Sequence, residues 1–107
     1  MWQVEILDER VAAELEALAP DLKAHFLRLA EMIQAVGLER IHEPHVKHLR
    51  DKLWEMRLTG RDGIARAIYV TASGRRVVVV LVFVKKTQKT PKATLQLAEQ
   101  RAKEIKP

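Results

Sequence analysis

The sequence contains no cysteine, which excludes disulfide bonds, thiol nucleophiles and thiolate-based metal sites. Residues that interrupt regular structure are also few, with 4 glycines and 4 prolines among 107 residues. Apolar residues make up 48% of the chain, a composition typical of a folded globule and not of a disordered tail. This length suits one modest hydrophobic core, so we expect residues 1–107 to form a single domain.

Long hydrophobic runs are absent as well. No apolar stretch reaches the roughly 20 residues that a membrane-spanning helix requires. The N-terminal residues, Met1 to Glu5, have neither the basic segment nor the apolar segment of a secretory signal. The sequence therefore predicts a soluble, cytoplasmic protein with no membrane partner.

Acidic and basic residues are distributed unevenly along the chain. Residues 1–46 contain 4 Lys/Arg and 9 Asp/Glu, whereas residues 47–107 contain 15 and 5. The positive excess of the second segment predicts a basic surface that attracts a polyanion, with nucleic acid as the leading candidate. The alternative is a solvated basic face that serves only solubility.

Hydrophobic periodicity predicts the element order β-α-α-β-β-β-α. The predicted strands are residues 2–7, 49–58, 64–70 and 77–84. Asp8 is placed to cap the first helix, and the second helix begins near Pro20 and ends at Gly37. Residues 38–47 have no clear period and are expected to connect the helices to the sheet, with at most one turn of helix. The last three strands should form an antiparallel meander because short turn sequences separate them.

Residues 77–84 are eight consecutive apolar residues, which indicates a central strand covered on both faces. The helical hairpin can cover one face, and a last helix, with Thr90 as its N-cap and Pro91 in its first turn, can cover part of the other. The predicted fold class is α+β, in which an N-terminal strand and an α-hairpin pack on a small, mostly antiparallel sheet, with a C-terminal helix. Trp54 is assigned to the core on the helix-facing side of the sheet.

Several cations lie at places where the predicted fold directs them. Lys85, Lys86 and Lys89 follow the buried strand directly. Arg57 lies near the end of the first meander strand, and Arg66 lies inside an apolar segment, where an unpaired guanidinium is costly. An ion pair between Arg66 and Glu55 is one alternative, and solvated surface lysines are another. The pattern nevertheless predicts an anion site.

Such cations suit the cleavage of an RNA strand. The attacking 2′-oxygen loses a proton, negative charge builds on the phosphorane oxygens, and the departing 5′-oxygen gains a proton. A lysine crowded by other cations has a lowered pKa and can act as a base, while a guanidinium offers a planar fork to phosphate. This chemistry requires no metal and no other cofactor.

Histidines and aromatic residues supply further candidates. His42, His45 and His48 are spaced by three, but Pro44 disfavours a helix through them, so no metal site is predicted. His48, next to Lys47, is a candidate for proton transfer or phosphate contact, with an ordinary surface histidine as the alternative. His25 is expected to be structural, at the border of the apolar stripe of the second helix. Tyr69 is a candidate for stacking on a base.

Three stretches of the second half resemble the RelE/ParE toxin superfamily, and more narrowly its phage-derived HigB-like branch. They are residues 47–57 (KHLRDKLWEMR), 65–69 (ARAIY) and 83–91 (FVKKTQKTP). The resemblance implies the toxin of a bacterial type II toxin–antitoxin pair, an endoribonuclease that cleaves messenger RNA on the ribosome without a metal. It also implies a helix-turn-helix antitoxin, HigA-like, which neutralises the toxin and links it to operator DNA.

The resemblance further implies a role for each matching residue. Arg57 and Arg66 would bind the scissile phosphate, and Lys85 and Lys86 would supply charge or proton transfer. The expected substrate-binding residues are Lys47, His48, Tyr69 and Lys89.

The C-terminal segment departs from the pattern of this superfamily. Many of its ribonucleases use a tyrosine or histidine near the C-terminus, and residues 91–107 contain neither. Two alternatives therefore remain open, a ParE-like inhibitor that binds DNA gyrase without chemistry of its own, and a basic nucleic-acid-binding accessory domain.

Overall fold

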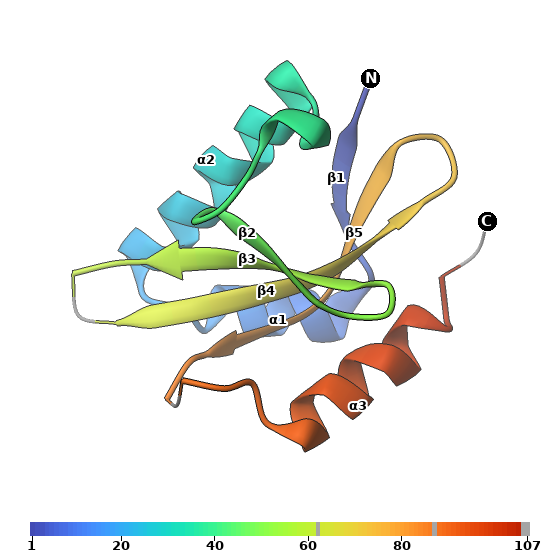
Figure 1. Ribbon diagram of the computed structural model, residues 1–107. Helices are drawn as coiled ribbons and strands as arrows, with labels where there is room; N and C mark the ends of the chain where they lie inside the picture. The colour runs from blue at the N-terminus through green and yellow to red at the C-terminus, as the bar shows by residue number, and fades with distance from the viewer. Residues whose placement is uncertain (62, 87, 106–107) are drawn as a thin grey trace.

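The computed structural model describes residues 1–61, 63–86 and 88–105, which form three α-helices and a five-stranded mixed sheet (Figure 1). The strands are β1 (Gln3–Ile6), β2 (Val46–Arg50), β3 (Leu53–Thr59), β4 (Ile64–Ala72) and β5 (Arg76–Val84). The helices are α1 (Glu9–Glu16), α2 (Pro20–Val36) and α3 (Lys92–Ala102), with one 3-10 turn, η1 (Leu38–Arg40). The predicted α+β class is confirmed.

The sheet has the order β1-β5-β4-β3-β2. β1 pairs with β5 in parallel, and the other neighbours pair antiparallel, as expected for a mostly antiparallel sheet. β5 thus lies between the N-terminal β1 and β4, and it connects β1 to the rest of the sheet. Its residues from Val77 to Val82 are all buried, which confirms the predicted central strand.

The prediction of one strand over residues 49–58 was wrong, because two strands share this segment. β2 and β3 form a hairpin whose tight turn contains Asp51, at φ 49°. An aspartate tolerates this left-handed conformation better than most residues, and the carbonyl of Asp51 contacts Nε2 of His48 at 2.8 Å. The meander therefore has four strands instead of three, and β2 forms one edge of the sheet.

Helices cover both faces of the sheet (Figure 1). The stripe Leu22, Phe26, Leu29 and Ile33 of α2 packs with Val11 of α1 on one face. The second helix ends as predicted at Gly37, whose φ of 94° suits a residue without Cβ.

The other face carries a second core, where Ala98 of α3 packs with Leu53, Ile68 and Val80. This confirms that the last helix covers part of the second face. α3 begins at Lys92 with Pro91 at the N-cap, so the prediction of Thr90 as N-cap was wrong. Among the described residues, no helix combines the length and the apolar character that would let it cross a membrane.

Side chains complete the outer edge of β5 where β1 ends. The carbonyl of Val80 accepts a hydrogen bond from Nη1 of Arg101 at 3.0 Å, and the N–H of Val82 donates to Oε1 of Glu14 at 3.0 Å. Arg101, only 7% exposed, also pairs with Glu14 at 2.9 Å. This cluster joins α1 and α3 across the edge of the sheet, and it satisfies backbone groups that would otherwise be buried without partners.

Candidate functional site

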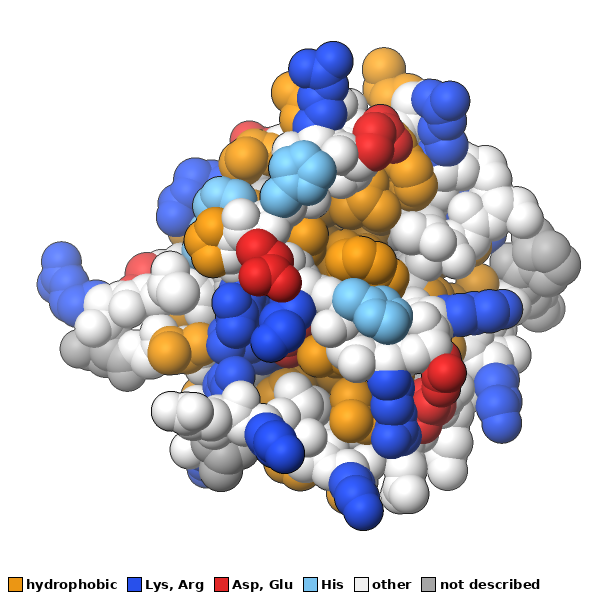
Figure 2. All heavy atoms as spheres, in the orientation of Figure 1, with side chains coloured by type: hydrophobic (Ala, Val, Ile, Leu, Met, Phe, Trp, Pro, Cys, Tyr) orange, Lys and Arg blue, Asp and Glu red, His pale blue; other side chains and the backbone are white. Residues whose placement is uncertain are grey.

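A basic hollow of about 610 Å³ lies at one end of the sheet. The described residues that line it are Lys47, Arg57, Ile64, Arg66, Lys85, Lys86 and Gln88. They come from β2, β3, β4 and the segment that follows β5. Figure 2 shows Lys and Arg side chains gathered at a recess of this surface.

Strand register explains why these cations meet. Arg57 on β3 lies directly opposite Arg66 on β4, and Arg66 lies opposite Phe83 on β5, so these side chains share one face of the sheet. Lys85 follows Phe83 by two residues, and its N–H donates to the carbonyl of Ile64 at 2.8 Å, which continues the ladder. Alternation along the strand therefore brings Lys85 to the same face as both arginines.

Glu55 lies beneath the basic hollow and is 2% exposed. Its Oε1 is 3.3 Å from Nε of Arg66 and 3.7 Å from Nε of Arg57. Its Oε2 has no hydrogen-bond partner among the described residues. The ion pair of Arg66 with Glu55, an alternative at the level of sequence, is thus present, but one carboxylate contacts two arginines and three lysines line the same hollow.

Burial changes the ionisation of two cations here. Arg66 is 5% exposed and donates from Nη1 to the carbonyl of Ala65 at 3.1 Å, and burial lowers the pKa of its guanidinium from the ordinary value. Burial also lowers the pKa of Lys85, and the positive charge of Arg66 lowers it further. A lysine in such surroundings releases its proton more readily than a lysine in water.

Of the other predicted site residues, some line the basic hollow and others lie outside it. Lys47 and Lys86 line the basic hollow, whereas Lys89 is exposed and is not among its lining residues. His48 lies outside the basic hollow and lines a second one.

The prediction of Tyr69 as a residue free to stack on a base was wrong. Tyr69 is 1% exposed, because it packs in the core between the sheet and α2, and this burial raises its pKa. Trp54, assigned to the core, is instead 38% exposed. The two residues lie opposite each other on β3 and β4, so both face the α2 side of the sheet, but Tyr69 is covered and Trp54 is not.

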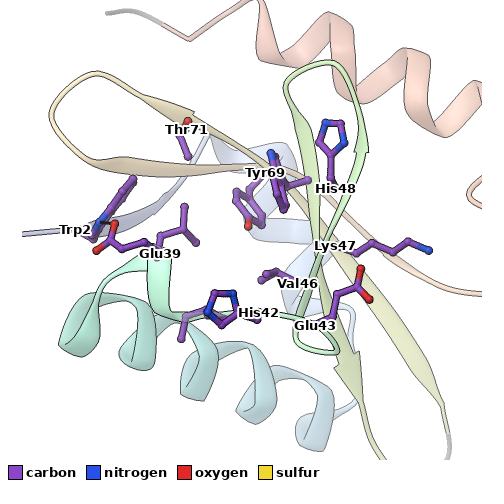
Figure 3. Close-up of a pocket in the computed structure, with 12 residues that line it drawn as sticks. Trp2, Glu39, His42, Glu43, Val46, Lys47, His48, Tyr69 and Thr71 are labelled. Carbon is purple, nitrogen blue, oxygen red and sulfur yellow. Dashed lines mark hydrogen bonds between the residues drawn. The ribbon is translucent and has the colours of Figure 1, made fainter.

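The second hollow, here called the aromatic hollow, has a volume of about 730 Å³ and lies on the α2 side of the sheet (Figure 3). The described lining residues are Trp2, Leu38, Glu39, Ile41, His42, Glu43, Val46, Lys47, His48, Trp54, Tyr69 and Thr71. Figure 3 shows Trp2 at one end, His48 at the other and Tyr69 between them. Lys47 lines both hollows, so they adjoin.

A third, smaller hollow of about 410 Å³ also adjoins the basic hollow, through Arg57, Ile64 and Arg66. It contains His25, whose Nδ1 accepts a hydrogen bond from the N–H of Thr59 at 2.9 Å. Burial lowers the pKa of His25, and the nearby Arg28 lowers it further, so the neutral form that accepts this bond is favoured. His25 therefore ties α2 to the end of β3. In the described part of the chain, no group of three or more His, Asp or Glu is placed to hold a metal ion.

Sequence reasoning named Glu55 only as the partner of an alternative ion pair with Arg66, and it missed Trp2 as part of the site. Glu55 had a detectable signal, since it alternates with Arg57 on one strand face. Trp2 had none, because its place beside the later strands depends on the parallel pairing of β1 with β5.

Comparison with known proteins gives a family and a fold. The family model described as "Phage derived protein Gp49-like (DUF891)" matches residues 13–103. A chain in the crystal structure of the archaeal RelE–RelB complex from Pyrococcus horikoshii OT3 is similar with a TM-score of 0.56 and 20% sequence identity. The match covers 78% of this chain and 93% of that one. At this identity the likeness shows the fold alone. A comparison with curated proteins gave no match.

Proposed function

Because this chain belongs to the phage-derived Gp49-like family, we propose that it is the toxin of a type II toxin–antitoxin pair and a metal-independent endoribonuclease. Within the RelE/ParE superfamily, the proposal places it in the HigB-like branch, with residues 1–107 acting as one domain. The observation that carries the proposal is the basic hollow, where cations from separate strands converge on a space large enough for a phosphodiester. The likeness in fold to the RelE–RelB structure supports it.

The mechanism we propose uses the cations of the hollow. Arg57 and Arg66 bind the scissile phosphate and stabilise the charge on its oxygens, because guanidinium groups offer planar, permanently charged donors. Lys85 takes the proton of the 2′-hydroxyl, in keeping with its lowered pKa. The 2′-oxygen then bonds to phosphorus, the bond from phosphorus to the 5′-oxygen breaks, and Lys86 donates a proton to that oxygen. The products are a 2′,3′-cyclic phosphate and a 5′-hydroxyl.

The partners follow from the same proposal. The substrate is messenger RNA, cut in the A site of the ribosome, and the protein acts in the cytoplasm. A HigA-like helix-turn-helix antitoxin neutralises the toxin and brings it indirectly to operator DNA. Lys47 and Lys89 contribute positive charge along the path of the RNA, and His48 contacts it from the aromatic hollow.

Two substitutions test the catalytic assignment. Arg57→Ala and Lys86→Ala should each lower the rate of RNA cleavage by roughly 100-fold or more, since each removes a cation that stabilises charge in the transition state. Both variants should accumulate to normal levels and lose toxicity when expressed. Lys103→Ala removes the same charge from the exposed C-cap of α3, outside the basic hollow, and should remain toxic. Toxicity of Arg57→Ala at normal protein levels would contradict the proposal.

Cleavage itself is measured by adding the purified protein to a translating extract and mapping the ends of the message. Cuts in phase with codons support the ribonuclease. Intact message together with accumulating gyrase cleavage complexes would instead assign the protein to the ParE-like inhibitors. If neither appears, and the protein binds RNA and DNA alike, it is an accessory binding domain.

A further inference from the structure

The aromatic hollow and the basic hollow meet at Lys47, which lines both. Arg57 and Trp54 are three residues apart on β3, so their side chains lie on opposite faces of the sheet, and the two hollows adjoin at its β2 edge. A ligand that occupies both must therefore pass over this edge, where Figure 2 shows hydrophobic side chains near the gathered Lys and Arg side chains. We propose that the aromatic hollow is a nucleobase site, which stacks a base of the RNA strand whose phosphate lies in the basic hollow. This inference rests on the proposed function, because it assumes that RNA is the ligand.

The walls of the aromatic hollow suit a stacked base. Trp54 is 38% exposed, and its ring lies 5.0 Å from the ring of His48, at 59° between the ring planes. Every base has a π-face, so an open aromatic ring binds single-stranded RNA by stacking. Trp2 supplies a second indole at the far end of the hollow (Figure 3).

Hydrogen bonds hold the rings of Trp2 and His48 in place before any ligand binds. Nε1 of Trp2 donates to Oε2 of Glu39 at 3.1 Å. Nε2 of His48 lies 2.8 Å from the carbonyl oxygen of Asp51 in the hairpin turn. Because the rings are already oriented, little side-chain freedom is lost when a base enters.

The charges around the two hollows determine which part of a nucleotide each can accept. Glu39 and Glu43 line the aromatic hollow, and a phosphate there would face two carboxylates. Lysines and arginines line the basic hollow, where a phosphate is favoured. His42 and Thr71 supply donors and acceptors for the edge of a base. The strand is therefore oriented across the β2 edge, with its backbone in the basic hollow and a base toward Trp54.

The tryptophans make the aromatic hollow directly observable. The chain contains 2 tryptophans, and both line this hollow, so quenching of intrinsic fluorescence reports its occupation. The probes are 2′-O-methyl trinucleotides of each single base, which cannot be cleaved because the attacking oxygen is blocked. An abasic oligomer with the same number of phosphates is the control ligand, because it can fill the basic hollow but has no base to stack.

We expect at least one base-bearing trinucleotide to quench the fluorescence, whereas the abasic oligomer binds more weakly and leaves it unchanged. Trp54→Leu should weaken trinucleotide binding by about 5- to 150-fold, the range that the loss of one stacked base produces. It should leave binding of the abasic oligomer unchanged. His48→Ala, a smaller change at an exposed position, should show the same pattern with a smaller loss, measured by the remaining tryptophans. Leu97→Ala truncates an exposed apolar side chain of α3, away from both hollows, and should bind like the unmodified protein.

The outcomes separate this inference from the proposed function. If the protein cleaves RNA but base-bearing and abasic oligomers bind equally, and Trp54→Leu has no effect on either, the base site is refuted and the ribonuclease stands. If it neither binds these oligomers nor cleaves message, both fail. Fluorescence that changes with protein concentration in the absence of RNA would mean that a second copy of the chain covers the hollow, which also overturns the inference.

Discussion

Glu55 places its carboxylate between two arginines that lie directly opposite each other on neighbouring strands. Like charges in this position repel, and a buried guanidinium without a partner is costly. Both ion pairs use the Nε side of the guanidinium, at 3.3 Å for Arg66 and 3.7 Å for Arg57. We therefore regard Glu55 as a positioning residue, which orients the arginines without touching the substrate.

Glu55→Gln tests this role, since it keeps the shape of the side chain and removes its charge. We expect the free energy of unfolding to fall by about 2–4 kcal/mol, because the buried arginines lose their counter-charge. We also expect single-turnover cleavage by the protein that remains folded to fall about 10- to 100-fold, as arginines that are displaced bind the phosphate less well. Urea unfolding and quenched-flow kinetics measure the two effects.

Glu99→Gln is the matched control, because Glu99 pairs with Arg50 at 2.6 Å in a half-exposed position outside the basic hollow. It should cost less than about 1 kcal/mol and leave cleavage unchanged. A Glu55→Gln protein that is less stable but cleaves at the normal rate would reduce Glu55 to a purely structural residue.

At the residue scale, the sequence indicated which cations belong to the anion site, but not how deeply each side chain is buried. In the structure, alternation along β3, β4 and β5, together with their register, brings Arg57, Arg66 and Lys85 to one side of the sheet. Whether a residue on the correct face is buried depends on where the helices end above it. Tyr69 and Trp54 face each other, yet only Tyr69 is covered, and no local pattern distinguishes them.

At the scale of elements, strong hydrophobic periodicity was sufficient to predict a helix or strand. The residue types of short turns were not sufficient to predict where a strand ends. α2 and β5 were predicted because an apolar stripe and an unbroken apolar run leave few alternatives. β2 was missed because its turn has no glycine, and Asp51 adopts a conformation in which glycine or asparagine is more usual. The mistake matters for the site, since Lys47 and His48 lie on this edge strand.

Arg101 links elements that are far apart in the chain, since it connects α3 to α1 and to β5. Arg101→Ala leaves the carbonyl of Val80 and part of Glu14 without a partner, so we expect unfolding to require about 2–4 kcal/mol less free energy. Thermal and urea denaturation check this value. Lys103→Ala, exposed in the same helical region, should change stability by less than about 0.5 kcal/mol. Equal stabilities for the two variants would mean that the cluster at the edge of β5 contributes little.

At the scale of the whole molecule, charge separates along the chain. Acidic residues dominate residues 1–46, which include α1 and α2, whereas the basic residues that line the basic hollow all come from residues 47–107. The sequence predicted a basic surface from residues 47–107, and the basic hollow is formed by residues of that segment. The sequence could not predict the aromatic hollow. Trp2 and Trp54 line the same hollow only because β1 pairs with β5, in a sheet whose other strands come from residues 46–84.

The charge distribution predicts how RNA binding depends on salt. Each phosphate contact with single-stranded RNA releases counterions, so three to five contacts should weaken binding by about 20- to 130-fold between roughly 50 and 200 mM salt. Titration of 2′-O-methyl RNA at several NaCl concentrations measures this slope. Lys86→Ala should reduce the slope by about 0.7, the value of one contact. A flat profile would exclude a surface dominated by phosphate contacts.

The parallel pairing of β1 with β5 also sets the order of events during synthesis. Residues 3–6 leave the translating ribosome well before their partners, residues 76–79. The nascent β1 must therefore wait, unpaired, until β5 has emerged. Lys85 and Lys86 emerge later still, so the anion site stays incomplete until the segment after β5 has left the ribosome.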